Sequence, residues 1–132
     1  MLVATTRAPV DDPAFLYSGE RGARVSLTDI GVSIPPATVR RVGEVQWPRR
    51  LPPDPRTEFA VLRAAPVDIS DSRRWMDEHL HAKRNVLIFV HGFNNRYEDS
   101  VYRFAQIVHD SGGDVTPVLF TWPSRASVFD YS

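Results

Sequence analysis

The 132 residues suffice for one domain with its own hydrophobic core, and two such domains would be crowded. Hydrophobic residues make up 42% of the chain and charged residues 24%, which is typical of a soluble globular protein. Sixteen basic residues balance sixteen acidic ones and there is no cysteine. The composition therefore gives no sign of a nucleic-acid-binding surface, and it excludes disulfides, thiolate metal sites and a cysteine nucleophile.

The amino-terminal end and the apolar runs bear on localisation. The longest apolar run is far shorter than the roughly 20 residues that cross a bilayer. Residues 1–4 are too few for a signal peptide, so an export signal would have to lie upstream of Met1. We expect a cytoplasmic chain without a membrane span.

Residues 1–57 are rich in proline, which predicts short strands and irregular loops rather than helices. Residues 2–6 read as a strand. Residues 24–34 alternate partly between apolar and polar side chains, which indicates either a bent strand or a hairpin interrupted at residues 29–31. Residues 48–55 are expected to form a loop.

Residues 58–132 show the patterns of alternating strands and helices. Tyr97, Val101, Phe104 and Val108 form an apolar stripe with helical spacing, and Gly112-Gly113 ends that helix. The predicted elements, in chain order, are a strand at 58–64, a helix at 71–81 capped by Asp71, a strand at 86–90, a helix at 97–110 and a strand at 117–121.

The strand at residues 86–90 is the most informative segment. Its five consecutive apolar residues predict a central strand of a parallel sheet, buried on both faces. Gly92 would permit a sharp turn where a side chain would clash, and Asn94 or Asn95 would cap the next helix. Strand, helix and strand with short joints predict a right-handed βαβ unit with a row of backbone N–H groups at the strand tip, where open α/β sheets bind ligands.

Two motifs in this half resemble a bacterial branch of the α/β-hydrolase (esterase/lipase-like) superfamily. They are His91-Gly92-Phe93-Asn94 and Trp122-Pro123-Ser124. Residues 3–7, 33–36 and 43–48 also resemble the amino-terminal pattern of that branch. The resemblance implies the amino-terminal portion of an α/β-hydrolase sheet, with antiparallel strands first and a parallel βαβ unit after them. Residues 1–132 would then be a single partial domain, divided into a strand and loop region (1–57) and a strand-helix-βαβ region (58–132).

The resemblance also implies roles for the turn. The backbone N–H of Phe93 would be one of two donors to the oxyanion of an acyl-transfer reaction. His91, Gly92 and Asn94 would shape the loop and contact the substrate, and Trp122 would be either a core residue or a wall of the substrate cleft. The alternative is a tight strand-to-helix turn without a ligand.

The serine nucleophile of such enzymes sits in a Gly-x-Ser-x-Gly elbow, and no pair of glycines in this sequence brackets a serine in that way. Ser124 is the nearest substitute, but Pro123-Ser124 is more typical of a turn. We therefore expect that this chain alone does not catalyse hydrolysis.

No metal or cofactor is indicated. His79 and His81 would lie on different faces of their helix, which does not suit chelation of one ion. The arginines are scattered and matched by acids, so we interpret them as solvated: Arg21, Arg24, Arg40, Arg41, Arg49, Arg50, Arg73 and Arg74. No glycine-rich phosphate loop is present.

Two hypotheses follow. In the first, the chain is the amino-terminal part of a serine hydrolase acting on a small ester or related acyl substrate. In the second, it is a non-catalytic binding or assembly module. In the superfamily the nucleophile strand lies beside the strand at 86–90, so without it this strand has an open edge that favours self-association. The open edge argues against the second hypothesis unless it is covered, and we expect the isolated chain to be poorly soluble, dimeric or only partly folded.

Overall fold

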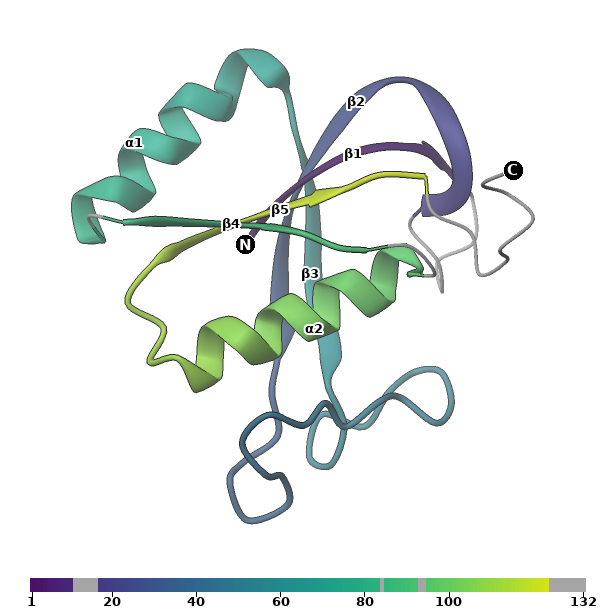
Figure 1. Cartoon of the computed structure of the whole chain (residues 1–132), viewed down its shortest axis with the longest axis vertical. Coiled ribbons are helices and arrows are strands. Elements are labelled where there is room, and N and C mark those ends of the chain that lie inside the picture. Colours follow the sequence, from purple (N-terminus) through teal and green to yellow (C-terminus); the bar gives the residue numbers. More distant parts are fainter. Residues whose placement is uncertain (11–16, 84, 93–94, 124–132) are drawn as a thin grey trace.

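The computed structural model describes residues 1–10, 17–83, 85–92 and 95–123. Eight elements follow one another along the chain (Figure 1). They are β1 (Leu2–Pro9), β2 (Tyr17–Ser33), β3 (Ala60–Val67), the short 3-10 helix η1 (Ile69–Asp71), α1 (Ser72–Ala82), β4 (Val86–Val90), α2 (Tyr97–Asp110) and β5 (Thr116–Thr121). Within these described residues, no helix has the length and apolar character needed to cross a membrane.

The strands form one mixed sheet in the order β3-β2-β1-β5-β4. β3, β2 and β1 pair antiparallel, whereas β1, β5 and β4 pair parallel. In this register Leu2 lies between Asp29 of β2 and Val118 of β5. The predicted α/β class, with antiparallel strands first and a parallel β4-α2-β5 unit after them, is confirmed, and the sheet contains strands from both 1–57 and 58–132.

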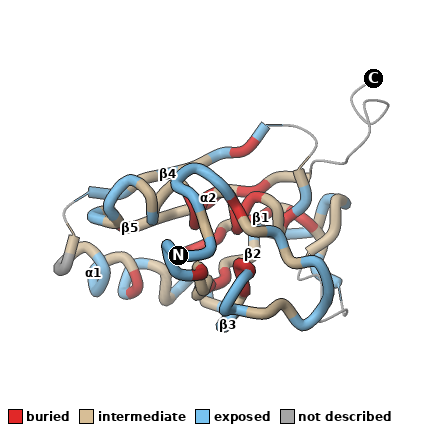
Figure 2. Tube along the Cα trace, turned by 90° about the horizontal axis from the view of Figure 1, so that it is seen from below, coloured by how far each residue is buried: buried red, intermediate tan, exposed pale blue. Residues whose placement is uncertain are grey.

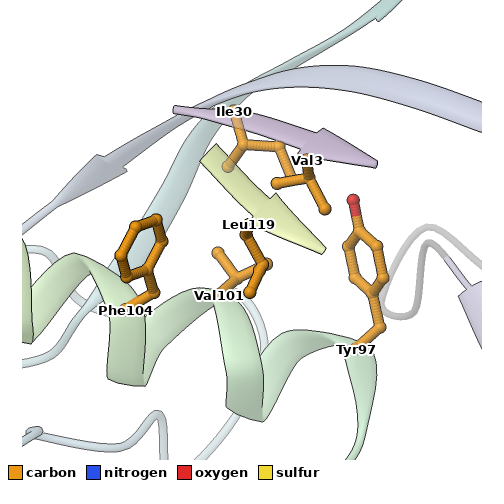
Figure 3. Packing of buried hydrophobic residues seen from close by; sticks show 6 residues of the cluster. All are labelled: Val3, Ile30, Tyr97, Val101, Phe104 and Leu119. Carbon is orange, nitrogen blue, oxygen red and sulfur yellow. The ribbon is translucent and has the colours of Figure 1, made fainter. Parts of the chain in front are cut away.

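The core lies between the sheet and one stripe of α2. Phe104 stacks on Phe89 of β4 with ring centroids 5.3 Å apart. Figure 2 shows the buried segments gathered inside the molecule, whereas α1 is mostly intermediate or exposed. Full burial of one large apolar side chain stabilises the folded state by about 1.5–3 kcal/mol. The main cluster, drawn in Figure 3, consists of Val3, Ile30, Leu119, Tyr97, Val101 and Phe104.

The ends of α2 follow partly from the sequence. The helix stops where Gly112 and Gly113 adopt positive φ angles of 104° and 69°, a conformation that glycine tolerates best. One of the two predicted alternatives placed Asn95 at the N-cap of this helix, and that alternative is wrong. Arg96 occupies the cap position, and its backbone N–H donates to the Asp99 carboxylate at 3.2 Å. Asn94, the other alternative, lies outside the described residues.

The prediction that residues 86–90 form a central strand buried on both faces is wrong for this sheet. β4 is the last strand in the sheet order, and among the described residues it pairs with β5 alone. Leu87 and Phe89 pack against the core on the α2 side. The alternate side chains Val86, Ile88 and Val90 are 37%, 65% and 56% exposed. The apolar run of β4 thus forms a strand whose one face is packed against the core and whose other face is apolar and exposed.

β2 is longer than the proline content suggests. It runs for 17 residues because no proline interrupts positions 17–33. The hairpin expected at residues 29–31 is wrong, since Asp29 pairs with both β1 and β3. The bent-strand alternative is the correct one: the register shifts between Gly31 and Val32, and Figure 1 shows a strongly curved ribbon.

Helix α1 begins after Asp71 as predicted, but the Asp71 side chain forms no capping hydrogen bond. It accepts instead from Arg74 at 3.2 Å. The far end of α1 is tied to the start of β5. There, Thr116 Oγ1 donates to the His79 carbonyl at 3.5 Å, and the Lys83 ammonium donates to the Gly113 carbonyl.

The loop between β2 and β3 is held to the end of α2 by a buried ion pair. Two guanidinium nitrogens of Arg40 donate to the Asp110 carboxylate at 2.7 and 2.9 Å, and the two side chains are 5% and 9% exposed. The Gly43 N–H and the Gln106 amide add donors at 2.7 and 2.9 Å. The interpretation of Arg40 as a solvated surface residue is therefore wrong, because its acidic partner lies 70 residues away in sequence.

Candidate functional site at the strand tips

The carboxyl ends of β4 and β5 lie side by side because the two strands are parallel neighbours. His91 follows β4 and Trp122 follows β5. Their rings stack with centroids 5.3 Å apart and an interplanar angle of 8°. The Trp122 indole N–H donates to the His91 carbonyl at 3.0 Å, so the two strand tips are joined by ring contact and by hydrogen bond.

Hydrogen bonds at both ring nitrogens fix the tautomer of His91. Nδ1 lies 2.6 Å from the Gly92 carbonyl oxygen, which can only accept, so Nδ1 carries the proton. Nε2 then accepts from the Thr121 hydroxyl at 2.9 Å and, over a longer 3.3 Å, from the Trp122 backbone N–H. As a whole residue, His91 is 5% exposed. With its Nε2 lone pair engaged, His91 is built to hold the turn rather than to accept a proton from a nucleophile.

A buried arginine lies behind this histidine. Arg7 is 1% exposed, and its Nε donates to Thr121 Oγ1 at 2.9 Å. Its two terminal nitrogens donate to the Asn95 carbonyl at 2.7 Å and to the Ser18 carbonyl at 3.2 Å. Thr121 Oγ1 accepts from Arg7 and donates to His91, so a continuous relay of hydrogen bonds runs from Arg7 to the imidazole.

The electrostatics of the cluster favour a neutral His91. Burial lowers the pKa of His91, and the positive charge of Arg7 lowers it further. The hydrogen bond to the Gly92 carbonyl acts in the opposite direction and is outweighed. The cluster therefore carries its positive charge on Arg7, which is linked to His91 through Thr121 and binds the Asn95 carbonyl.

The predicted site residues are placed as follows. His91 is buried and Gly92 is exposed at the strand tip, while Trp122 is half-buried and covers the His91 ring. The side chain of Asn95 donates to the Gly92 carbonyl at 3.3 Å. Phe93 and Asn94 lie outside the described residues, as does Ser124. The structure therefore describes the residues on either side of positions 93–94.

The steric reason given for Gly92 is wrong. A Cβ placed on Gly92 would meet nothing within 4 Å, and Gly92 is not among the glycines with positive φ. Glycine at this position leaves the backbone of the strand tip accessible from solvent. This is the property that a ligand-binding turn requires.

Sequence reasoning missed Arg7 and Thr121. Val3, Thr5 and Arg7 alternate along β1, and all three are nearly fully buried at 0%, 0% and 1% exposure. The alternation placed Arg7 on the inward face of its strand, and that was the available signal. Thr121 stands immediately before the Trp-Pro-Ser motif, and the sequence pattern predicts for it only the end of a strand.

Comparison with known proteins agrees with this geometry. Residues 69–132, which include β4, α2, β5 and both motifs, match the family described as "Alpha/beta hydrolase of unknown function (DUF900)". This match supports an α/β-hydrolase assignment for the matched residues. The match leaves residues 1–68 outside, and no curated protein or solved structure gave a significant match. The similarity thus covers the region that forms the strand tips and the helix between them.

Proposed function

We propose that this chain supplies the oxyanion-stabilising turn of a serine hydrolase that cleaves an ester or a related acyl bond. The backbone N–H of Phe93 is the donor, and the second donor belongs to the residue after the nucleophile. His91 holds the turn, whereas Gly92, Asn94 and Trp122 border the substrate. The observation that carries the proposal is the buried Arg7-Thr121-His91 relay, which fixes the strand tip beside an accessible glycine.

The positive charge behind the turn fits this role. Arg7 binds the Asn95 carbonyl on the far side of the turn, so that carbonyl is directed towards the guanidinium. A fixed cation in a buried site stabilises negative charge that develops nearby, and it needs no rearrangement during the reaction. A neutral His91 adds no competing proton donor on its Nε2 side.

The 132 residues contain no Gly-x-Ser-x-Gly elbow. We therefore expect no turnover of p-nitrophenyl butyrate by the purified chain above the uncatalysed rate. Turnover that disappears in Ser124→Ala would contradict the proposal, because it would place the nucleophile at the Trp-Pro-Ser motif. Turnover that is identical in both proteins would indicate a contaminating esterase.

The donor itself can be tested in a longer chain that carries an in-frame Gly-x-Ser-x-Gly segment after residue 132. Phe93→Pro removes the backbone N–H, and we expect kcat to fall by about 100–1000-fold. The matched control is Phe93→Ala, which keeps the N–H and removes only the side chain. Equal kcat values for the two variants would show that the amide of residue 93 is not the donor.

A second candidate, a non-catalytic assembly module, is favoured by the edge strand β4. Its side chains Val86, Ile88 and Val90 are exposed, and within the described part of the chain β4 pairs with β5 alone. Such edges pair with other strands. The partner that fits a self-complementary edge is a second copy of the chain. Sedimentation of the wild type is then expected to show a dimer.

Ile88→Lys is expected to make this protein monomeric with little change in stability, because Ile88 is 65% exposed. Leu62→Lys is the matched control, since Leu62 is 69% exposed on β3 at the opposite edge of the sheet. If both variants behave like the wild type in sedimentation, β4 is not the interface.

A further inference from the structure

Two neighbouring cavities lie between α2, the residues 47–53 loop and strands β2 and β3. The inner one has a volume of about 280 Å³, and aliphatic side chains that include Ile30, Val61 and Val101 line it. The outer one has a volume of about 560 Å³. Leu51, Glu98 and Tyr102 line both cavities, so the two are adjoining parts of one depression.

The outer cavity combines positive charge with aromatic walls. Arg49 and Arg50 reach it from the loop, and Arg96 reaches it from the start of α2. Trp47 and Tyr102 form the walls, with their rings edge to face at a centroid distance of 6.1 Å. The guanidinium of Arg103 lies over the Trp47 ring, 5.8 Å from its centroid, which adds a further cation next to this wall.

Two carboxylates oppose this charge. Asp99 is occupied, because it accepts the backbone N–H of Arg96 at the helix start. Glu98 lines both cavities, and its carboxylate accepts a hydrogen bond from its own backbone N–H. Burial raises the pKa of Glu98. The arginines outnumber these two acids, so the outer cavity attracts an anion.

The inner cavity differs in chemistry. Arg63 is its cation, and this side chain is held by Asp29 at 2.9 Å. The other side chains that line it are mainly apolar, which suits a hydrocarbon chain more than a charged group.

We propose that the joined cavities bind a small aliphatic carboxylate, with its head group at Arg49, Arg50 and Arg96 and its hydrocarbon chain in the inner cavity. This site lies along α2 and the β2–β3 loop, and its lining does not include the strand-tip residues His91, Gly92 or Trp122. The proposal does not depend on acyl hydrolysis, so either proposal can fail alone.

Calorimetric titration of the purified chain with four small molecules tests the ligand class. Octanoate is expected to bind, and hexanoate to bind roughly tenfold more weakly because two methylene groups fewer are buried. Octylammonium and inorganic phosphate are each expected to bind more than about tenfold more weakly than octanoate, since one lacks the negative charge and the other lacks the chain. Octylammonium or phosphate binding as tightly as octanoate, or no saturable binding of octanoate, would overturn the proposal.

Variants locate the site. The double variant Arg49→Gln with Arg50→Gln changes exposed side chains only, so it should remain folded, and we expect its affinity for octanoate to fall about tenfold. Glu98→Gln is expected to strengthen binding by about threefold, because it removes the opposing charge. The control Arg73→Gln removes an exposed arginine on α1 and should leave affinity unchanged. Unchanged affinity in the double arginine variant, or weaker binding in Glu98→Gln, would place octanoate elsewhere.

Discussion

An arginine from another segment is bound near each end of helix α2, Arg40 from the β2–β3 loop and Arg7 from β1. The two arginines serve different purposes. At the carboxyl end, Arg40 forms a two-pronged ion pair with Asp110 and fastens the residues 34–59 loop to the helix. Before the amino end, Arg7 donates to a hydroxyl and to two main-chain carbonyls, which belong to β5, β2 and the turn. The first arginine is matched by a carboxylate that joins two segments. The second gathers several segments around the strand tips, which is the arrangement of a site whose geometry has to be fixed.

The largest expected effect is that of Arg7→Met. It removes the donor to the buried Thr121 Oγ1 and to the partly buried carbonyls of Ser18 and Asn95. Hydrogen bonds to charged groups contribute about 1.5–3 kcal/mol each and are not additive, so we expect a loss of about 4 kcal/mol in the free energy of unfolding by urea. Arg7→Lys keeps the charge but lacks the several guanidinium donors, so it should recover only part of the lost free energy of unfolding. A loss below about 1 kcal/mol in Arg7→Met would remove the distinction between the two arginines.

Arg40→Met is expected to cost about 3 kcal/mol, because it leaves a largely buried carboxylate without its cation. The Arg40 hydrogen bonds hold the pKa of Asp110 well below its usual range, helped by the donors of Gly43 and Gln106 and opposed by burial. Because this folded-state pKa is depressed, the stabilisation is complete above the unfolded value of about 3.9 and is lost as the pH falls below it. Urea midpoints measured across this acid range should fall less steeply in Asp110→Asn than in the wild type. Equal slopes would show that Asp110 does not set the acid response.

The smallest effect concerns the titration of His91. Its lowered pKa predicts a proton NMR titration midpoint below about 6.5, with the resonance assigned by its absence in His91→Gln. Because the folded state holds His91 neutral, the stabilisation from this residue is complete above about pH 6.5. It declines as the pH falls through the folded-state pKa of His91. Arg7→Lys, which retains the charge, should keep the midpoint low. A midpoint at or above 6.5 in the wild type would mean that the ring is not held neutral.

Local patterns predicted the elements well and the tertiary partners poorly. The residues 97–110 helix was predicted with its observed bounds because the apolar stripe and the two glycines are local signals. The strands at 86–90 and 117–121 were also found, but an apolar run cannot say whether a strand lies inside a sheet or at its edge. Arg40 was misjudged because its partner is 70 residues away. At the site, the sequence indicated His91, Gly92 and Trp122, whereas the relay that orders them needed the three-dimensional neighbourhood of β1 and β5.

The parallel pairing of β1 with β5 has a consequence for how this protein is made. Arg7 and Thr121, which bond directly, are 114 positions apart in the sequence. A ribosome has to release the chain through residue 121 before the cluster at the strand tips can assemble, and contacts between such distant positions are slow to form. Until then, β1 has only its antiparallel neighbour β2 available. A nascent chain that stops short of residue 121 would therefore leave Arg7 without its threonine partner, and the strand-tip cluster should be among the last parts of the molecule to become ordered.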